Sequence, residues 1–353
     1  MTKIRINTIN KYYVHLEKNS DNLTNILADY KNRKFLIISD ENVWREQGEN
    51  LIKSFKDNSF EYDKVVLKPG EETKSLETCN RIYYELSKRN MTRSDILVAF
   101  GGGVVGDLTG FVASTYLRGI KFIQIPTSLL AQADSSIGGK VGVNLPQGKN
   151  LVGSFYNPEF VYINTAFLNS LDEKEWNNGM AEIIKAGLIK DKYLFEQIDK
   201  LNKNELMENI LELLYLALEV KRKLVEEDFR DTGSRMLLNF GHTFGHAFEK
   251  QANFKNLRHG EAVGLGMIVA LLIGEQRNFH SKEIREKLTK NLFKIGLPIN
   301  YEKYLNKETF DILLKDKKII NGFLNMILLK DIGNSVIEKI ALDDIGEVKK
   351  CLL

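Results

Sequence analysis

Short apolar runs alternate with amphipathic stretches over the first half of the chain. Four of these runs are typical of buried strands, at residues 34–39, 64–67, 96–100 and 122–125. Residues 76–89 carry apolar side chains at helical spacing. Strands that alternate with helices predict a mostly parallel, Rossmann-like sheet covered on both faces. Glycine and turn residues concentrate at positions 101–158, where we expect long loops.

The pattern changes after about residue 168. Apolar residues then recur at a spacing of about 3.6, which is typical of helices. The segments concerned are 173–188, 205–229, 236–251, 261–278 and 282–293. Residues 323–329 are consistent with a short strand. We therefore predict an α/β domain at 1–167, a mainly helical domain at 168–353, and a ligand site in the cleft between them.

Composition narrows the class of protein. The chain has 353 residues, enough for two domains, and a net charge of +3 from 50 Lys+Arg against 47 Asp+Glu. This balance argues against nucleic acid or a membrane surface as a partner. Two cysteines make no disulfide framework. The longest apolar run, 263–274, is too short to span a bilayer, and we expect a cytoplasmic protein without a targeting signal.

A glycine-rich segment follows the run that ends at Phe100. Residues 101–107, GGGVVGD, contain G-x-G-x-x-G and precede a helical pattern. Such glycines let a backbone approach a pyrophosphate at a helix N-terminus, although any tight turn also needs glycine. The acid that usually ends the next strand is absent from 121–127, and Asp40 upstream is the only acid that ends an early strand. A bound dinucleotide would therefore need a different order of units.

Three of the five histidines fall within 18 residues. His242 and His246 are four residues apart on one face of the predicted helix 236–251, and His259 begins the next element. This arrangement favours a divalent metal site. The sequence HTFGH lacks the glutamate of the zinc proteases. The alternative is that these are core histidines bonded to backbone carbonyls.

A carboxylate must complete such a metal site. Glu182 is a candidate, because it lies on the apolar face of a predicted helix, where an unpaired glutamate would be costly. Its alternative is a buried ion pair with Lys185 or Arg235. Lys140, Arg235 and Asn239, in glycine-rich or apolar surroundings, suggest an anionic substrate. The alternative for most of the 50 basic residues is a solvated surface.

Five blocks of sequence then carry a resemblance that covers nearly the whole chain. They are GGGVVGDLTGF (101–111), IPTSLLAQADSSIGGKVGVN (125–144), GMAEIIKAGLI (179–189), LLNFGHTFGHAFE (237–249) and RHGEAVGLGM (258–267). In these blocks the chain resembles the 3-dehydroquinate synthase family of the sugar-phosphate cyclases. The resemblance implies that Glu182, His242 and His259 bind Zn2+, or Co2+, and that His246 handles protons instead of binding metal.

The resemblance also implies an NAD site in the first domain, with the second domain binding metal and substrate. The implied NAD contacts are Asp40, Asn42, Glu71, Lys74, Gly103, Val104, Val105, Gly106, Asp107, Thr127, Ser128, Lys140, Lys149, Phe167, Leu168, Asn169 and Ser170. The implied catalytic residues are His246, Lys140, Lys185, Asn150 and Asp134. The implied substrate contacts are Lys221, Arg235, Asn239, Arg118 and one of Lys317 and Lys318. Arg118 resembles an arginine that reaches a neighbouring subunit's site, which implies a homodimer.

The implied reaction converts 3-deoxy-D-arabino-heptulosonate 7-phosphate into 3-dehydroquinate and phosphate. It passes through transient oxidation at C5 by NAD, elimination of phosphate, re-reduction and an intramolecular aldol closure, as a lyase of the shikimate pathway. One alternative is another sugar-phosphate cyclase, whose substrate lacks the carboxylate. Another is a metal-dependent NAD polyol dehydrogenase, which would release NADH.

Overall fold

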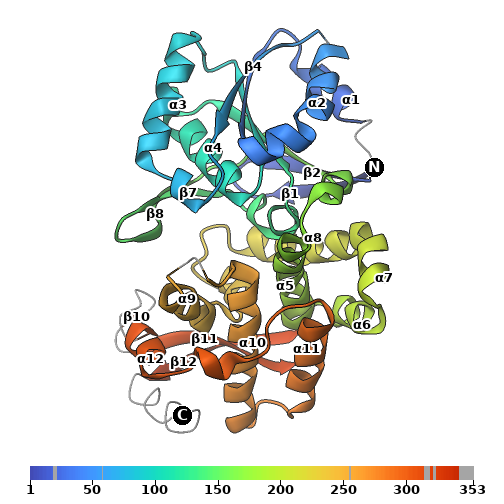
Figure 1. The fold of residues 1–353 in the computed structure, drawn as a ribbon, viewed down its shortest axis with the longest axis vertical. Helices are drawn as coiled ribbons and strands as arrows, with labels where there is room; N and C mark the ends of the chain where they lie inside the picture. Colours follow the sequence, from blue (N-terminus) through green and yellow to red (C-terminus); the bar gives the residue numbers. More distant parts are fainter. Residues whose placement is uncertain (19–21, 58, 254–255, 314–318, 321–322, 342–353) are drawn as a thin grey trace. The chain divides into compact units, whose positions relative to one another are not determined.

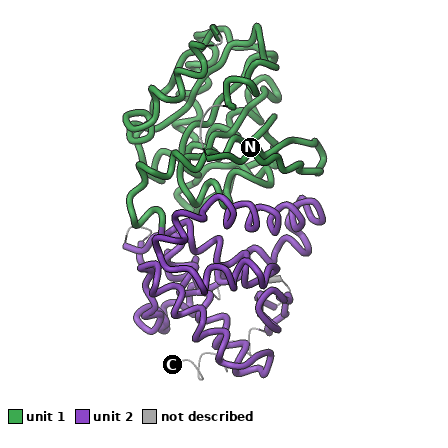
Figure 2. The backbone as a smooth tube through the Cα atoms, turned by 90° about the vertical axis from the view of Figure 1, so that its right-hand side faces the viewer, with its two compact units in different colours: residues 1–176 green, residues 177–353 purple. Residues whose placement is uncertain are grey.

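The computed structural model describes residues 1–18, 22–57, 59–253, 256–313, 319–320 and 323–341. It forms two compact units, residues 1–176 and 177–353, which we describe one at a time (Figure 2). No helix among the described residues is both long enough and apolar enough to cross a membrane.

Unit 1 is built on a seven-stranded sheet in the order β1-β2-β9-β6-β5-β3-β4. The strands are β1 (Thr2–Asn7), β2 (Lys11–Glu17), β3 (Lys34–Asp40), β4 (Glu61–Leu67), β5 (Ile96–Gly101), β6 (Lys121–Pro126) and β9 (Phe160–Asn164). β1 and β2 pair antiparallel, and the other pairings in this sheet are parallel. The predicted mostly parallel sheet is confirmed: the four predicted strands are β3 to β6.

Helices cover both faces of this sheet because side chains alternate along each strand. Leu36 and Ile38 of β3 share a core with α3 (Leu76–Lys88) and α4 (Gly103–Thr115). Phe35 and Ile37 share the opposite core with α1 (Leu23–Leu27) and α2 (Glu41–Asp57). Figure 1 shows these two pairs of helices on opposite sides of the strands.

The strand order places a switch point between β3 and β5. From β3 the chain passes through α2 to β4 on one side, and from β5 it passes through α4 to β6 on the other. The chain therefore leaves the carboxyl ends of two neighbouring strands in opposite directions. In open α/β sheets, ligands bind at such a position.

The prediction of long loops at 101–158 is wrong. This stretch forms α4, η4 (Tyr116–Arg118), β6, a short π-helical turn η5 (Ala131–Ser135), and a hairpin of β7 (Lys140–Leu145) and β8 (Gly148–Phe155). Its glycines allow close packing: a Cβ added to Gly142 would lie 2.7 Å from the carbonyl oxygen of Val152 across the hairpin. The glycine content that suggested loops thus reflects backbones in close contact.

Unit 2 is mainly helical, as predicted, with a small antiparallel sheet. The helices are α5 (Glu173–Lys190, which begins at the end of unit 1), α6 (Lys192–Lys200), α7 (Lys203–Glu208), α8 (Ile210–Glu227), α9 (His242–Gln251), α10 (His259–Gln276), α11 (Glu283–Lys294) and α12 (Lys307–Leu313). The strands are β10 (Ile319–Ile320), β11 (Phe323–Asp331) and β12 (Asn334–Ala341). The predicted strand at 323–329 is β11. Phe248, Leu265, Phe310 and Leu328 form part of one core that joins α9, α10 and α12 to this sheet (Figure 1).

The single helix expected at 236–251 is wrong. A 3-10 turn, η7 (Ser234–Asn239), ends before Gly241, and α9 begins only at His242. Gly241 has a φ of +80°, which glycine adopts without strain and which interrupts the helix. The expected helix 205–229 is likewise divided, into α7 and α8 at Asn209.

Candidate active site

Close backbone contacts bring α5, α9 and α10 together. A Cβ added to Gly241 would lie 2.7 Å from the carbonyl oxygen of Val263 in α10, and one added to Gly266 would overlap the carbonyl of Gly241. At the start of α10, the Gly260 N–H donates to the side-chain oxygen of Asn178 in α5. Glycine at these positions therefore sets how closely the three helices approach.

Each of these helices contributes one member of a candidate metal site. Glu182 comes from α5, His242 is the first residue of α9, and His259 is the first residue of α10. One ligand atom from each lies within 4.8 Å of the other two. Glu182 Oε1 lies 3.8 Å from His242 Nε2 and 3.4 Å from His259 Nε2. One carboxylate oxygen and two imidazole nitrogens around one point suit a zinc-like ion with open positions.

The second nitrogen of each imidazole faces an oxygen atom. His242 Nδ1 lies 3.2 Å from the carbonyl oxygen of Phe240, to which an Nδ1–H donates. His259 Nδ1 lies 3.6 Å from Oε2 of Glu249. Both histidines consequently turn Nε2, the nitrogen that would bind a metal, towards Glu182.

The charges in the cluster keep Glu182 ionised although it is buried. Burial raises the pKa of Glu182, but the ammonium of Lys185, which contacts its Oε2, and the imidazole of His259 together outweigh burial and lower the pKa to about 2. Burial lowers the pKa of His259, whereas the carboxylates of Glu182 and Glu249 raise it to about 10. Burial, with the charge of Lys185, lowers the pKa of His242. The predicted alternative, an ion pair with Lys185, is thus present beside the histidines.

The donor set fits a divalent cation. Among the described residues, neither buried oxygen of Glu182 accepts a hydrogen bond of regular geometry. An ionised carboxylate that is buried without such bonds is costly, and a cation bound between it and two imidazoles would remove that cost.

His246 lies one helical turn after His242, and its side chain is exposed. Its ring centroid lies 5.3 Å from that of His242 and 6.2 Å from that of His259. It can form a second ligand group with Glu249 and His259, which shares His259 with the group that contains Glu182.

The segment before α9 carries Arg235, one of the predicted anion contacts. Arg235 is buried, and its Nη1 donates to the carbonyl oxygen of Phe229 at 2.7 Å. The carboxylate of Asp228 accepts the backbone N–H groups of Thr232, Gly233 and Arg235. Burial raises the pKa of Asp228, but these hydrogen bonds outweigh it and lower the pKa. Asp228, which the sequence pattern did not single out, therefore holds the turn that presents Arg235.

Two further predicted contacts flank this segment. Lys221 is buried in α8, and Asn239 is the last residue of η7. Lys317 and Lys318 lie outside the described residues.

In unit 1, two of the predicted nucleotide contacts, Asp40 and the glycine-rich segment, lie at the switch point. Asp40 ends β3, and the glycine-rich segment follows β5, with which β3 pairs directly. No side chain caps the first turn of α4, and that turn contains no acidic residue. A Cβ added to Gly103 would lie 3.0 Å from Ser135 Oγ, so only glycine leaves this space open. Uncapped N–H groups beside such a space fit a pyrophosphate.

A second group of predicted residues forms a connected polar network. Lys74 Nζ lies 2.5 Å from both Asp107 Oδ2 and Asn150 Oδ1. Asn144 donates from Nδ2 to Oε1 of Glu71 at 2.7 Å, and its Oδ1 accepts the Asn150 N–H at 2.9 Å. Asn144 lies in one of the recognised blocks but was not predicted as a site residue.

The remaining predicted residues of unit 1 occupy several elements. Asn42 and Val43 donate their N–H groups to Asp40 Oδ1, so that Asp40 also stabilises the start of α2. Ser170 Oγ accepts from Gln47 of α2, and Phe167 packs edge-on against Phe100 at 5.5 Å. The others are Val104, Val105 and Gly106 in α4, Arg118 in η4, Thr127 and Ser128 after β6, Asp134 in η5, Lys140 in β7, Lys149 in β8, and Leu168 and Asn169 in η6 (Thr165–Ser170).

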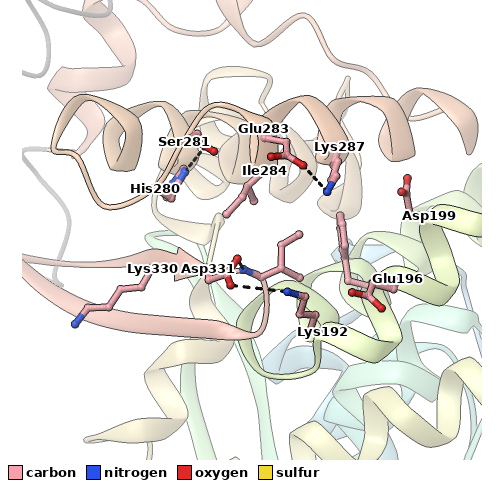
Figure 3. A pocket seen from close by; sticks show the side chains of 12 residues that line it. Lys192, Glu196, Asp199, His280, Ser281, Glu283, Ile284, Lys287, Lys330 and Asp331 are labelled. Atoms are coloured by element: carbon pink, nitrogen blue, oxygen red, sulfur yellow. Dashed lines mark hydrogen bonds and ion pairs between the residues drawn. The ribbon is translucent and has the colours of Figure 1, made fainter.

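A cavity of about 440 Å3 in unit 2 contains none of the predicted residues (Figure 3). Its wall includes Phe195 and Ile284 and a rim of charged side chains. In Figure 3, Lys287 is paired with Glu283 at 2.7 Å and Lys192 with Asp331 at 3.9 Å. Two of the three lysines that line the cavity are therefore already paired with carboxylates, which makes it a poor match for a phosphorylated substrate.

The chain is similar to known proteins along most of its length. The family model of the 3-dehydroquinate synthase N-terminal part matches residues 64–178, and that of the C-terminal part matches residues 179–319. A 3-dehydroquinate synthase of Clostridium botulinum is 47% identical over 310 residues, covering 88% of this chain and 89% of that protein.

Two solved structures share the fold over the whole chain. One is 2-deoxy-scyllo-inosose synthase complexed with carbaglucose-6-phosphate, NAD+ and Co2+, with a TM-score of 0.88 and 26% identity over 100% of both chains. The other is 2-epi-5-epi-valiolone synthase from Streptomyces hygroscopicus with NAD+ and Zn2+ bound, with a TM-score of 0.88 and 26% identity over 99% of both chains.

Proposed function

The chain belongs to the 3-dehydroquinate synthase family, and from this premise we propose that it converts 3-deoxy-D-arabino-heptulosonate 7-phosphate into 3-dehydroquinate and phosphate. It is thus an enzyme of the cyclase type, and we assign it to the phosphate-eliminating lyases of the shikimate pathway. The observation that carries this proposal is the cluster of Glu182, His242 and His259, whose ligand atoms lie close enough together to hold a metal ion.

We propose that unit 2 binds Zn2+ or Co2+ through Glu182, His242 and His259. NAD would be held in unit 1 by the α4 N-terminus and by Asp40, with the other predicted contacts around them. When bound, NAD would exchange a hydride with C5 of the substrate, and the metal would act as a Lewis acid at the oxygen on that carbon.

The side chains of the protein would position the substrate and move its protons. Lys221, Arg235 and Asn239 would bind its phosphate and carboxylate oxygens, since lysine and arginine form strong hydrogen bonds to such anions. The positive charge of Lys185, together with His259, keeps Glu182 ionised and so ready to bind a cation. His246, exposed beside the ligands, would carry a proton between the substrate and solvent.

In unit 1, Lys140, Asn150 and Asp134 would complete the catalytic set. The network around Lys74 supports this role for Asn150, because it holds the Asn150 side chain and backbone in place. Lys74 is itself buried, so its side chain holds the network in one position.

The test is whether phosphate release requires NAD only in catalytic amounts. We expect continuous release of phosphate from the heptulosonate phosphate, with flat bulk absorbance of NADH. Accumulation of free NADH in proportion to product would instead identify a polyol dehydrogenase. Turnover of glucose 6-phosphate, with none of the heptulosonate, would identify a different cyclase.

We further propose a homodimer in which Arg118 serves the neighbouring subunit's site. Arg118 is exposed, and its φ of +63° is uncommon for a residue with a side chain, which supports a functional position. Mixing two inactive variants, Arg118→Ala and His242→Ala, should restore about a quarter of the wild-type rate through mixed dimers. No recovery after subunit exchange would rule out this role.

A further inference from the structure

Glu249 lies on the same face of α9 as His242 and His246. The three residues follow one another at intervals of four and three, which places them one above another on a helix. Glu249 is only 4% exposed, and its Oε2 lies 3.6 Å from His259 Nδ1. A buried carboxylate is costly unless it is paired, and the imidazole of His259 is a partner.

The two candidate histidine ligands are held in different ways. A backbone carbonyl accepts from His242, whereas a carboxylate faces His259. A carboxylate fixes the tautomer and orientation of a ligating imidazole, as a carbonyl does, and also makes the imidazole a stronger base and a better ligand.

We propose that Glu249 is a positioning residue, which holds the ring of His259 by its Nδ1 and so strengthens metal binding at Nε2. This inference rests on the proposed metal site of Glu182, His242 and His259. Glu249 was not among the predicted site residues, and this proposal gives its buried carboxylate a role.

The geometry favours this role over a second metal ion. Glu249, His246 and His259 could hold an ion of their own, but that ion would have to take a nitrogen of His259. His259 turns Nε2 towards Glu182 at 3.4 Å, and only Nδ1 faces Glu249. An imidazole with a proton on Nδ1 offers one lone pair, so one metal per chain is expected.

The experiment measures Zn2+ affinity by chelator competition in wild type, Glu249→Gln and Glu249→Leu. We expect Glu249→Leu to bind zinc about 10- to 100-fold more weakly, as is typical for loss of such a partner. Glu249→Gln keeps an acceptor of the same shape, so we expect a smaller loss. The matched control is Glu17→Gln: Glu17 is 5% exposed in unit 1, where Tyr162 and Asn22 donate to it. It should leave zinc affinity unchanged.

Two readouts separate positioning from a structural role. Replacing zinc with Co2+ should give an altered ligand-field spectrum in both Glu249 variants. Added metal should also raise the Tm of the variants less than that of wild type, whereas a structural role would lower the Tm equally with and without metal. Unchanged zinc affinity in both variants would overturn the inference.

The stoichiometry of the wild type distinguishes the remaining outcomes. Two ions per chain, with one lost in the Glu249 variants, would make Glu249 a ligand of a second site and overturn the positioning role. A wild-type protein that binds no metal would remove the proposed metal site, and this inference with it.

Discussion

The predicted residues of unit 1 and unit 2 are built in opposite ways. In unit 1, Lys74 contacts both Asp107 and Asn150, and Asp40, at the end of β3, accepts backbone N–H groups. In unit 2, Glu182 is buried against two histidines and a lysine without a hydrogen bond of regular geometry among the described residues. The residues in unit 1 are hydrogen-bonded to one another or to the backbone, whereas those in unit 2 form a cluster of buried charged side chains.

We infer from this difference that the stability of the fold depends more on the site in unit 2 than on the site in unit 1. A site made by the backbone at a strand end can lose a side chain and stay folded. A site made of buried ionised groups depends on its metal, because the free energy of binding the metal is also free energy of folding. The following predictions test this contrast.

The largest effect should follow the loss of a metal ligand. His242→Ala should lose stoichiometric metal and about 1,000-fold or more in kcat, since metal catalysis contributes several kcal/mol. His246→Ala should retain the metal and lose only rate. Metal content by atomic spectroscopy, together with phosphate release, checks both variants. Equal loss of metal in both would make His246 a ligand.

The next effect separates the anion contacts from the nucleotide contacts. Arg235→Ala should weaken substrate binding by about 2–5 kcal/mol, a typical loss when one partner of a buried charged pair is removed. Its NAD affinity should change little. Asp40→Ala should show the reverse pattern. Calorimetric titration with each ligand measures both affinities, and a variant that weakens both equally would contradict the division of roles.

A third prediction compares the two ligands as stabilisers. Metal at 100 times its Kd should stabilise the protein by about 2.7 kcal/mol. In hydrogen exchange, the added protection should fall on α5, α9 and α10 for the metal, and on β3, β5 and the start of α4 for NAD. Protection of the same segments by both ligands would show that the contrast between the units is wrong.

The smallest effect concerns His15, a buried histidine of β2 with no predicted role. Burial, with the charge of Lys3, lowers the pKa of His15 from 6.5 to about 4. As the pH falls, His15 binds a proton in the unfolded chain before it does so in the folded chain. The free energy of unfolding is therefore unaffected by His15 above pH 6.5 and decreases as the pH falls from 6.5 towards 4. The loss should reach about 2 kcal/mol at pH 5.

Denaturant unfolding at pH 7.5 and pH 5 measures this loss. His15→Phe removes the titrating group, so its stability should fall less between the two pH values than that of wild type. An equal fall in both proteins would show that other groups cause the acid sensitivity.

The sequence predicted four of the seven strands of the sheet, β3 to β6, but not β1, β2 and β9, nor the order of the strands. Runs of apolar residues located β3 to β6, because buried parallel strands are apolar on both faces. That Asp40 lies beside the glycine-rich segment depends on β3 pairing with β5, which no local pattern contains. In the sequence, the acid of a usual dinucleotide unit is missing after the glycine-rich segment. In the folded chain, Asp40 at the end of β3 lies on the strand next to β5.

The candidate metal ligands were predictable from the sequence, but the residues that hold the candidate active site in place, Glu249 and Asp228, were not predicted. Three histidines in 18 residues indicated it, and the resemblance selected Glu182. Glu249 has a signal that was missed, since it lies seven residues after His242 on the same helical face. Asp228 has none, because its role depends on a turn whose three N–H donors converge only in the folded chain.

The contact of α9 with α10 through Gly241 and Gly266 has a consequence for the choice of ion. His242 and His259 are each the first residue of their helix, so the distance between the two backbones fixes the span between the two imidazoles. With the helices already touching, their backbones cannot approach further, and they move apart only if the core behind them separates. At the proposed metal site, the packing of these two glycines would therefore limit the size of the ion that fits, and a redesign for a larger ion would have to include them as well as the ligands.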